Sequence, residues 1–401
     1  MSRLNESRDI AWIIVAAFGL IAAGVVSPKQ ATGEASRTTD DLWTRTKRVF
    51  AQNEPHRARY PGIAKTAAGQ IVVLYTKVTT EQEAAGRGQI MVIRSNDEGQ
   101  TWSKAQVVYT SQTGQPRAVG SLTQLRSGQL CATVTEMDRE QRPVSVRLIT
   151  SKDGESWHTG SPISFPGLSE GAWLCPHGQL IETSTGDLLM TGYGPGLPGA
   201  TKGKMSAVLV RSENGGRSWD TPTIIAAREN TDYTHTAAVQ LDDGSLLAVY
   251  GAGNEIFRSS SEDGGDTWSS PELTLAGREP HLLQIDGNAI ACVGSHGGPL
   301  EGRSWGHSWI AFSYNDGESW RCDRKVIEHP GEPGGHLGWP SGLALDAENV
   351  MVPYGHTQRP VRSQDGPHIP GPASAESERI EIAFFHREEP FHHIFIMAHH
   401  R

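Results

Sequence analysis

Ser261-Glu-Asp-Gly-Gly-Asp-Thr-Trp268 is one of five octapeptides that repeat a single pattern in this chain. The other four are Ser95-Asn-Asp-Glu-Gly-Gln-Thr-Trp102, Thr150-Ser-Lys-Asp-Gly-Glu-Ser-Trp157, Ser212-Glu-Asn-Gly-Gly-Arg-Ser-Trp219 and Ser313-Tyr-Asn-Asp-Gly-Glu-Ser-Trp320. In each, a hydroxyl residue comes first, and it is followed in order by an Asp or Asn, a Gly, a Ser or Thr, and a final Trp. The copies follow one another at intervals of 49 to 62 residues, and such a period indicates a repeat architecture.

A second repeat lies upstream of each octapeptide, where two apolar strands flank a short turn. Apolar strands around a turn that contains Gly are typical of a β-hairpin. Five of these hairpins turn at a Gly, and the sixth turns at Asp346-Ala-Glu-Asn349 without one. The six segments are 64–76, 122–135, 180–193, 239–250, 282–293 and 343–354.

The two repeats together predict modules of four strands: a hairpin, a third strand, the octapeptide turn and a fourth strand. Six such modules predict an all-β fold, a six-bladed β-propeller with four-stranded antiparallel blades, over residues 42–401. The last module lacks an octapeptide. We expect 380–385 to form its outer part, Val49-Phe50 to supply the closing strand, and 358–378 to be an insertion.

The N-terminus is predicted to be a separate segment. Arg3 and Arg8 precede an uncharged, apolar run at 10–26, which is the layout of an export signal. The run is also near the shortest length that spans a bilayer. We therefore expect residues 1–31 to be a signal peptide or membrane anchor and 32–41 a linker, with the protein periplasmic, extracellular or membrane-anchored.

The composition bounds the partners and the cofactors. A formal net charge of −9 without a basic run disfavours nucleic acid. The four cysteines match no zinc spacing and are expected to be buried small residues, with Cys292 and Cys322 the pair most apt to share a module. We expect no metal, no other cofactor, no membrane contact beyond a possible N-terminal anchor, and a monomer.

The octapeptide is predicted to be structural, with Gly in a left-handed turn, polar side chains bonding the turn amides, and Trp packing between blades. These octapeptides resemble the Asp-boxes of the sialidase superfamily, and the resemblance covers nearly the whole chain after its N-terminal segment. It implies that ligands bind where the first strand of each blade begins and the second ends. We call this end of the propeller the mouth. The Asp-boxes would then lie on the opposite face.

This layout assigns a set of polar and aromatic residues to the mouth. Aromatic rings, guanidinium groups, imidazoles and carboxylates at one place suit a polar, anionic sugar. Residues before the first strands are Arg59-Tyr60-Pro61, Arg117, Trp173, His177, Tyr233, His235, Arg278-Glu279-Pro280-His281, His336 and Trp339. Residues after the second strands are Lys77, Glu81, Glu83, Glu136, Asp138, Arg139, Tyr193, Asn254, Glu255, His296, Tyr354 and His356.

The resemblance also implies a catalytic set: three arginines around a substrate carboxylate, a Tyr nucleophile with a Glu partner, and an Asp acid/base. Arg59-Tyr60-Pro61 matches the family's Arg-Ile-Pro motif. Elsewhere the sequence departs from the family, with Gly251 and His296 near the positions of the second and third arginines and Gly338-Trp339-Pro340 in place of the Tyr. Segments 278–283 and 338–341 look closer to an exported, sialidase-like branch of the superfamily.

The sequence therefore leaves three functions open: a sialidase-like exo-glycoside hydrolase acting on an acidic or decorated glycan, a uronate polysaccharide lyase, and a glycan-binding propeller without catalysis. The partner is a glycan in each case. Candidate catalytic residues are Glu279, Glu136, Asp138, Tyr233 and His235. Candidate substrate-binding residues are Arg59, Arg117, Arg278, His281, His296, Trp339 and Tyr354.

Overall fold

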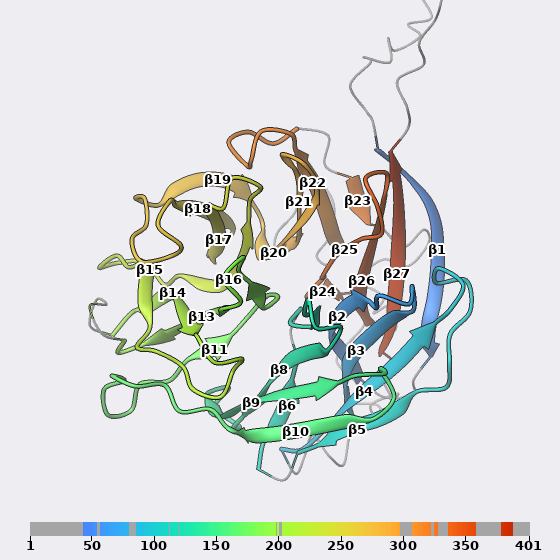
Figure 1. The fold of residues 1–401 in the computed structure, drawn as a ribbon, viewed down its shortest axis with the longest axis horizontal. Coiled ribbons are helices and arrows are strands. Elements are labelled where there is room, and N and C mark those ends of the chain that lie inside the picture. Colours follow the sequence, from blue (N-terminus) through green and yellow to red (C-terminus); the bar gives the residue numbers. More distant parts are fainter. Residues whose placement is uncertain are drawn as a thin grey trace, which may run out of the picture. The chain divides into compact units, whose positions relative to one another are not determined.

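The computed structural model describes residues 43–53, 57–79, 86–111, 113–118, 120–197, 199, 203–296, 307–321, 325–327, 336–357 and 378–387. In this part of the chain the strands form six antiparallel sheets, and no helix is present. The sheets are the blades of a six-bladed β-propeller, so the predicted fold class is confirmed (Figure 1).

Three blades have four uninterrupted strands each. Blade 1 consists of β2 (Arg57–Lys65), β3 (Ile71–Val78), β4 (Gln89–Ser95) and β5 (Gln106–Thr110). Blade 4 consists of β16 (Thr234–Gln240), β17 (Leu246–Ala252), β18 (Glu255–Ser261) and β19 (Glu272–Ala276). Blade 5 consists of β20 (Arg278–Asp286), β21 (Ala289–His296), β22 (His307–Ser313) and β23 (Lys325–Ile327).

In the other three blades the first strand is interrupted. Blade 2 has β6 (Gln115–Arg117), β7 (Thr123–Gln124), β8 (Leu130–Met137), β9 (Pro143–Ser151) and β10 (Trp157–Pro162). Blade 3 has β11 (Cys175–Pro176), β12 (Ile181–Glu182), β13 (Leu188–Pro195), β14 (Met205–Ser212) and β15 (Thr223–Ala226). Blade 6 has β24 (His336–Gly338), β25 (Leu343–Ala344), β26 (Asn349–Thr357) and β27 (Glu378–Arg387).

The ring is closed by the start of the chain. Strand β1 (Trp43–Asn53) pairs antiparallel with β27 as the outer strand of blade 6, and Val49 lies opposite Ile382. Figure 1 shows the two strands, one blue and one red, side by side. The closing strand predicted around Val49-Phe50 is thus confirmed.

The hydrophobic core is divided among the contacts between blades. Each of six buried clusters combines residues of two neighbouring blades; Phe312 of blade 5 and Phe385 of blade 6, for example, share one cluster. One of these clusters joins blade 6 to blade 1. Because a two-sided sheet must bury both faces, each blade depends on both neighbours.

The Asp-boxes are turns held by their own side chains, as predicted. In blade 4, Ser261 Oγ donates to Asp263 Oδ1 and accepts from the Gly265 amide, both at 2.8 Å. Asp263 Oδ1 also accepts from the Thr267 amide at 2.9 Å. Gly265 has a φ of 102°, and a Cβ there would lie 3.0 Å from Leu209 of blade 3. The Trp of each box packs against a cluster between two blades.

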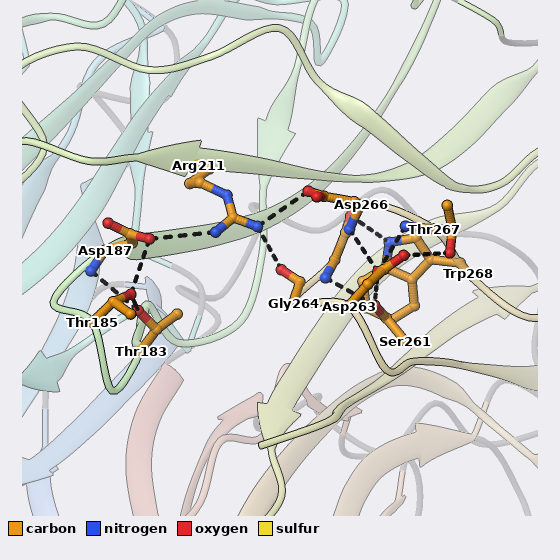
Figure 2. Close-up of polar contacts among 11 residues, drawn as sticks. Thr183, Thr185, Asp187, Arg211, Ser261, Asp263, Gly264, Asp266, Thr267 and Trp268 are labelled. Carbon is orange, nitrogen blue, oxygen red and sulfur yellow. Dashed lines mark hydrogen bonds and ion pairs between the residues drawn. The ribbon is translucent and has the colours of Figure 1, made fainter.

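An arginine clamps each of three Asp-boxes to the preceding blade. Figure 2 shows Arg211 of blade 3 between Asp187, at 3.3 Å, and the carbonyl oxygen of Gly264 in the blade 4 box, at 2.7 Å. Arg94 and Arg258 make the equivalent bond to the next box at 2.9 and 3.0 Å. Because Asp187 lies in the turn between the first two strands of blade 3, the boxes and these turns share one face, opposite the mouth.

Several predictions concern residues that the structure does not describe. Residues 1–42 are outside the described part of the chain, so the signal peptide or anchor stays a prediction. No described helix is long and apolar enough to cross a membrane. Cys131 and Cys175 are buried and free, and Cys292 is buried. Because Cys322 is not described, its pairing with Cys292 stays a prediction.

Candidate functional site

Four blades bend their first strand at the mouth through a left-handed residue. Tyr60, His235, Glu279 and Trp339 have φ values of 56°, 54°, 52° and 51°. In blades 1, 4 and 5 the residue falls where the pairing register of the first strand shifts. In blade 6 it follows β24 directly. A bulky residue with positive φ is strained, and such strain is concentrated at functional sites.

Prolines fix three of these bends. Pro61, Pro280 and Pro340 directly follow Tyr60, Glu279 and Trp339. A residue before proline normally adopts an extended conformation, so its left-handed φ is a further departure. Proline itself has no amide to leave unpaired at the bulge.

Blades 2 and 3 lack this device. Their positive φ values at the mouth, 60° and 81°, belong to Gly120 and Gly178. These glycines are needed for packing as well, because a Cβ on Gly120 would lie 2.6 Å from the ring of His281. The mouth is therefore asymmetric, with side chains presented from the bulges of four blades and glycine at the bends of two.

Two of the strained residues form the centre of a cation–aromatic stack. The rings of Tyr60 and Trp339 lie 4.5 Å apart between centroids. The Arg117 guanidinium lies 4.8 Å from the Tyr60 centroid, and that of Arg59 lies 5.5 Å from the Trp339 centroid. Such contacts hold a guanidinium in place.

The carboxylate of Glu279 is held from one side. Its Oε2 accepts hydrogen bonds from Ser295 Oγ at 2.7 Å and from the backbone amide of Trp339 at 3.1 Å. Among the described residues, Oε1 has no hydrogen-bond partner. The side chain is half-buried. Glu279 is thus oriented by two donors and keeps one oxygen available to a ligand.

A group of aromatic and imidazole side chains lies next to Glu279 at the mouth. The His235 ring lies 5.3 Å from Tyr193 and 5.2 Å from His177. Trp173 contacts Tyr193 at 6.3 Å, edge to face. These rings and the stack come from blades 1, 2, 3, 4 and 6, with the His177 ring buried behind that of His235.

Burial sets the protonation of this group. Burial lowers the pKa of His235. The negative charge of Glu279 opposes this shift, and the positive charges of Arg117 and Arg278 reinforce it. Burial raises the pKa of Tyr193 well above its usual value, and the neighbouring Cys175 adds to the effect. At neutral pH the imidazole is therefore uncharged and can accept a proton, whereas the phenol keeps its proton.

The two other predicted arginines flank His235. Arg117 donates to the Gln141 side chain, while its Nε is buried and has no partner among the described residues. Arg278 is exposed, and its Nε donates to Asn254 Oδ1 at 2.7 Å.

Three predicted residues lie away from this group. The buried carboxylate of Glu136 accepts bonds from Tyr109, Ser111 and Thr113 at 2.8, 2.5 and 2.7 Å. Burial alone would raise the pKa of Glu136, but these bonds and Arg147 outweigh it and lower the pKa. Tyr233 is fully buried against Tyr250 and Phe257. Tyr354 is fully buried and donates to Glu381 at 2.7 Å.

The remaining candidates occupy different places. Asp138 lies in a surface turn, bound to Arg142 at 3.0 Å. His281 is buried beneath the mouth, with Nε2 bonded to the Gly120 carbonyl oxygen at 3.2 Å. The side chain of His296 is outside the described residues. The structure thus brings together Arg59, Arg117, Arg278, Glu279, His235 and Trp339.

Sequence reasoning missed two partners of these residues, Ser295 and Gln141. Neither belongs to a motif, and Ser295 is found only through the register in which it opposes Arg278. Tyr60, His177, Trp173 and Tyr193 were assigned to the mouth without a role. The available signal was the recurrence of a bulky residue before Pro in blades 1, 5 and 6.

The assembled group combines one accessible carboxylate, guanidiniums fixed on rings, a neutral imidazole and a protonated phenol. Rings pack against the apolar faces of sugars, guanidiniums bind carboxylate or sulfate, and carboxylate and imidazole exchange protons. No group of three or more metal-ligating side chains occurs in the described part of the chain.

Comparison with known structures identifies similar folds. An uncharacterised protein from Dyadobacter fermentans aligns with a TM-score of 0.68 at 18% identity, over 86% of this chain and 100% of its own. The NanB sialidase from Streptococcus pneumoniae, as the K499G mutant, aligns with a TM-score of 0.59 at 14% identity, and the alignment covers 85% of this chain and 70% of the sialidase chain. The Trypanosoma rangeli sialidase aligns with a TM-score of 0.55 at 16% identity, and the alignment covers 82% of this chain and 55% of the sialidase chain. At these identities the likeness concerns the fold alone.

Comparison of sequences gives the family. No curated protein matches the chain. The model of the BNR repeat-like domain matches residues 33–175 and 112–279, which together span more than half of the 401 residues. The chain therefore belongs to the BNR repeat-like domain family, and its six-bladed propeller fold is similar to that of the sialidases to which it aligns.

Proposed function

We propose that this protein is an exo-glycoside hydrolase that acts on an acidic glycan at the propeller mouth. The observation that carries the proposal is the carboxylate of Glu279, whose Oε2 is held by Ser295 and the Trp339 amide while Oε1 has no hydrogen-bond partner among the described residues. The sialidase-like fold supports a glycan-related function in general.

In this proposal the residues divide the work. Arg117 and Arg59 bind the anionic group of the sugar, and the Trp339 ring packs on an apolar face of a sugar unit. Glu279 accepts a proton from the attacking water through Oε1, while Ser295 holds Oε2. Tyr193, which keeps its proton, donates a hydrogen bond to the oxygen of the leaving group. As the glycosidic bond breaks, that oxygen takes up a proton from solvent water, and Glu279 afterwards releases its proton to solvent.

The test is a screen of acidic glycans and aryl glycosides for sugar release, comparing the native protein with Glu279→Gln. A general base contributes about 10²–10⁴-fold to a rate, so Glu279→Gln should lower release by about that factor. Glu272→Gln, which alters an exposed carboxylate paired with Arg258 on β18, is the matched control and should leave release unchanged. Equal release by Glu279→Gln and the native protein would refute the role of Glu279.

A second candidate, β-elimination from a uronate polymer, is favoured by the contact between His235 and Tyr193. A neutral base and a protonated phenol side by side suit removal of a proton next to a carboxylate that an arginine neutralises. This reaction gives an unsaturated product that absorbs ultraviolet light, and Tyr193→Phe should abolish it. Binding of the same polymers without any product would support the third function, a glycan-binding propeller.

We further propose that residues 1–31 direct export. Fractionation of cells that express the full chain and a variant starting at residue 32 tests this. The full chain should lie outside the cytoplasm, as a soluble or membrane-attached protein, and the shortened one inside it. Cytoplasmic location of both would overturn the export proposal.

A further inference from the structure

Four buried polar side chains lie just behind the strained residues of the mouth, one from each of four consecutive blades. They are His177, Thr236, His281 and Ser341, with exposed fractions of 4%, 0%, 1% and 0%. Thr236 follows His235 directly, and His281 follows Glu279 by two positions.

These four residues are neighbours in the fold. Thr191 Oγ1 donates to the carbonyl oxygens of both His177 and Thr236, at 2.7 and 3.0 Å. The rings of His177 and His281 are close enough to interact electrostatically. His281 and Ser341 meet at Gly120, where an added Cβ would lie 2.6 Å from His281 Cδ2 and 3.7 Å from Ser341 Cβ.

Five polar atoms of these four residues have no hydrogen-bond partner among the described residues. They are Nδ1 and Nε2 of His177, Oγ1 of Thr236, Nδ1 of His281 and Oγ of Ser341. The backbone of Thr236 lies near the His177 ring, but not in hydrogen-bonding geometry with either nitrogen. In folded proteins more than about 90% of buried polar groups are bonded to protein or ordered water, so five together indicate a ligand.

The protonation states limit what this ligand can be. A carbonyl oxygen only accepts, so the bond to Gly120 requires a proton on His281 Nε2 and leaves Nδ1 as an acceptor. Burial lowers the pKa of His281 to about 4 and that of His177 well below its usual value, so both rings are neutral at physiological pH. The ligand must donate to Nδ1 and accept from the hydroxyls while carrying no charge.

We propose that His177, Thr236, His281 and Ser341 form a buried site for a hydroxyl ligand, which is either ordered water or a hydroxyl group of the glycan. Such an oxygen both donates and accepts, as these atoms require. The site would support the bulges at His235 and Glu279 from behind.

A crystal structure of the full propeller tests the proposal and separates the two sources. For water, the protein crystallised without glycan should show electron density within hydrogen-bonding distance of Ser341 Oγ and His281 Nδ1. For a sugar hydroxyl, that density should appear only after soaking with a bound acidic oligosaccharide. Absence of density in both crystals, or side chains bonded to one another instead, would overturn it.

Unfolding measurements give an independent readout that does not require turnover. If Thr236 Oγ1 binds a ligand, Thr236→Val, which has nearly the same shape, should lower the unfolding midpoint by about 1–2 °C. If the hydroxyl is truly unsatisfied, its removal should raise the midpoint. Thr191→Val, which removes a hydroxyl with two known partners, is the matched control for the size of a loss.

A double-mutant cycle then tests whether one ligand joins the residues. Losses for Thr236→Val and Ser341→Ala should be less than additive if both hydroxyls bind the same oxygen or chain of oxygens. Strict additivity together with raised midpoints would contradict the site. Should Thr236→Val fail to fold, Ser341→Ala alone and the crystal density still decide the question.

Discussion

Tyr60 and Trp339 are 279 positions apart in sequence, yet their rings lie 4.5 Å apart at the mouth. Both residues have a left-handed backbone and both precede a proline. Blades 1 and 6 thus meet through two strained residues, and each ring also carries an arginine. The first and last blades thus contribute jointly to one cation–aromatic stack at the mouth.

Replacing Trp339 with Ala should weaken the binding of acidic glycans by about 10-fold or more. The variant loses the ring proposed to pack on the sugar and the ring that positions the Arg59 guanidinium. An aromatic contact of this kind is worth roughly 0.5–1.5 kcal/mol, and about 1.4 kcal/mol is a factor of ten in Kd. Isothermal titration calorimetry measures the change. Trp320→Phe, on the opposite face, should bind as the native protein does; unchanged affinity of Trp339→Ala would exclude the stack from the site.

Replacing Arg211 with Lys should destabilise the propeller by about 1–2 kcal/mol. Lysine cannot bridge Asp187 and the Gly264 carbonyl oxygen together, and both contacts are partly buried (Figure 2). Urea unfolding measures the loss. Arg142→Lys is the control, because its ion pair with Asp138 is exposed and should be worth less than about 0.5 kcal/mol. Equal losses for the two variants would contradict a clamp between blades.

The Asp-boxes should make the protein acid-sensitive. Hydrogen bonds, led by that from the Thr101 side chain, lower the pKa of Asp97 to about 2, and the Ser156 amide leads those that do the same for Asp153. The pKa of Asp263 is lowered too, mainly by the Thr267 side chain. Because an unfolded Asp titrates near 3.9, the unfolded state takes up protons first, and this stability is lost as pH falls from about 4 towards 2.

Two boxes already contain the neutral counterpart, since Asn214 and Asn315 make the equivalent bonds to Ser218 and Ser319. A protein with Asp97→Asn, Asp153→Asn and Asp263→Asn should therefore fold. Its stability should fall less steeply than that of the native protein between about pH 4 and 2, measured by urea unfolding at a series of pH values. An unchanged slope would contradict this account.

His281 should give a second loss of stability at milder acidity. Its pKa is lowered by burial to about 4 in the folded protein, against about 6.5 when unfolded, so the unfolded state binds the proton first. Stability should be full above about pH 6.5 and fall towards pH 4, by about 1.4 kcal/mol per pH unit from this group.

His281→Gln can still donate to the Gly120 carbonyl oxygen. In that pH range it should remove the contribution of one proton from the slope of the unfolding free energy against pH, measured by urea unfolding. Thr191→Val should instead lower stability equally at each pH, since no titrating group is removed. A slope that His281→Gln leaves unaltered would mean that the ring is already charged in the folded protein.

The fold was predictable because it rests on periodic signals. The octapeptides mark a turn whose bonds are local, from Ser261 to Asp263 and Gly265 for example, so the sequence carries the whole motif. The closing strand could be placed because 380–385 lacked a partner. Interruption of the first strand in blades 2, 3 and 6 was not foreseen, because it depends on bulges that have no single sequence signature.

The site was only partly predictable, because the pairing register decides whether a side chain at the end of a strand faces the mouth or the core. Glu136 and Glu279 both lie at the mouth ends of strands, yet Glu136 is turned into the core and bonded to hydroxyls. Tyr233 and His235 are two residues apart and would share a face in a regular strand. The bulge at His235 contributes to separating them, leaving Tyr233 buried in the core and His235 half-buried in the mouth.

Closure of the ring by β1 has a consequence for the order of events in synthesis. Val49 leaves the ribosome long before its partner Ile382 is made. Blade 6 cannot be completed until β27 has been made, so closure of the ring depends on strands that are far apart in the sequence, and such pairing is slow. Until then two strand edges remain open to pairing with other chains, a hazard that a chaperone or a delay before release would limit.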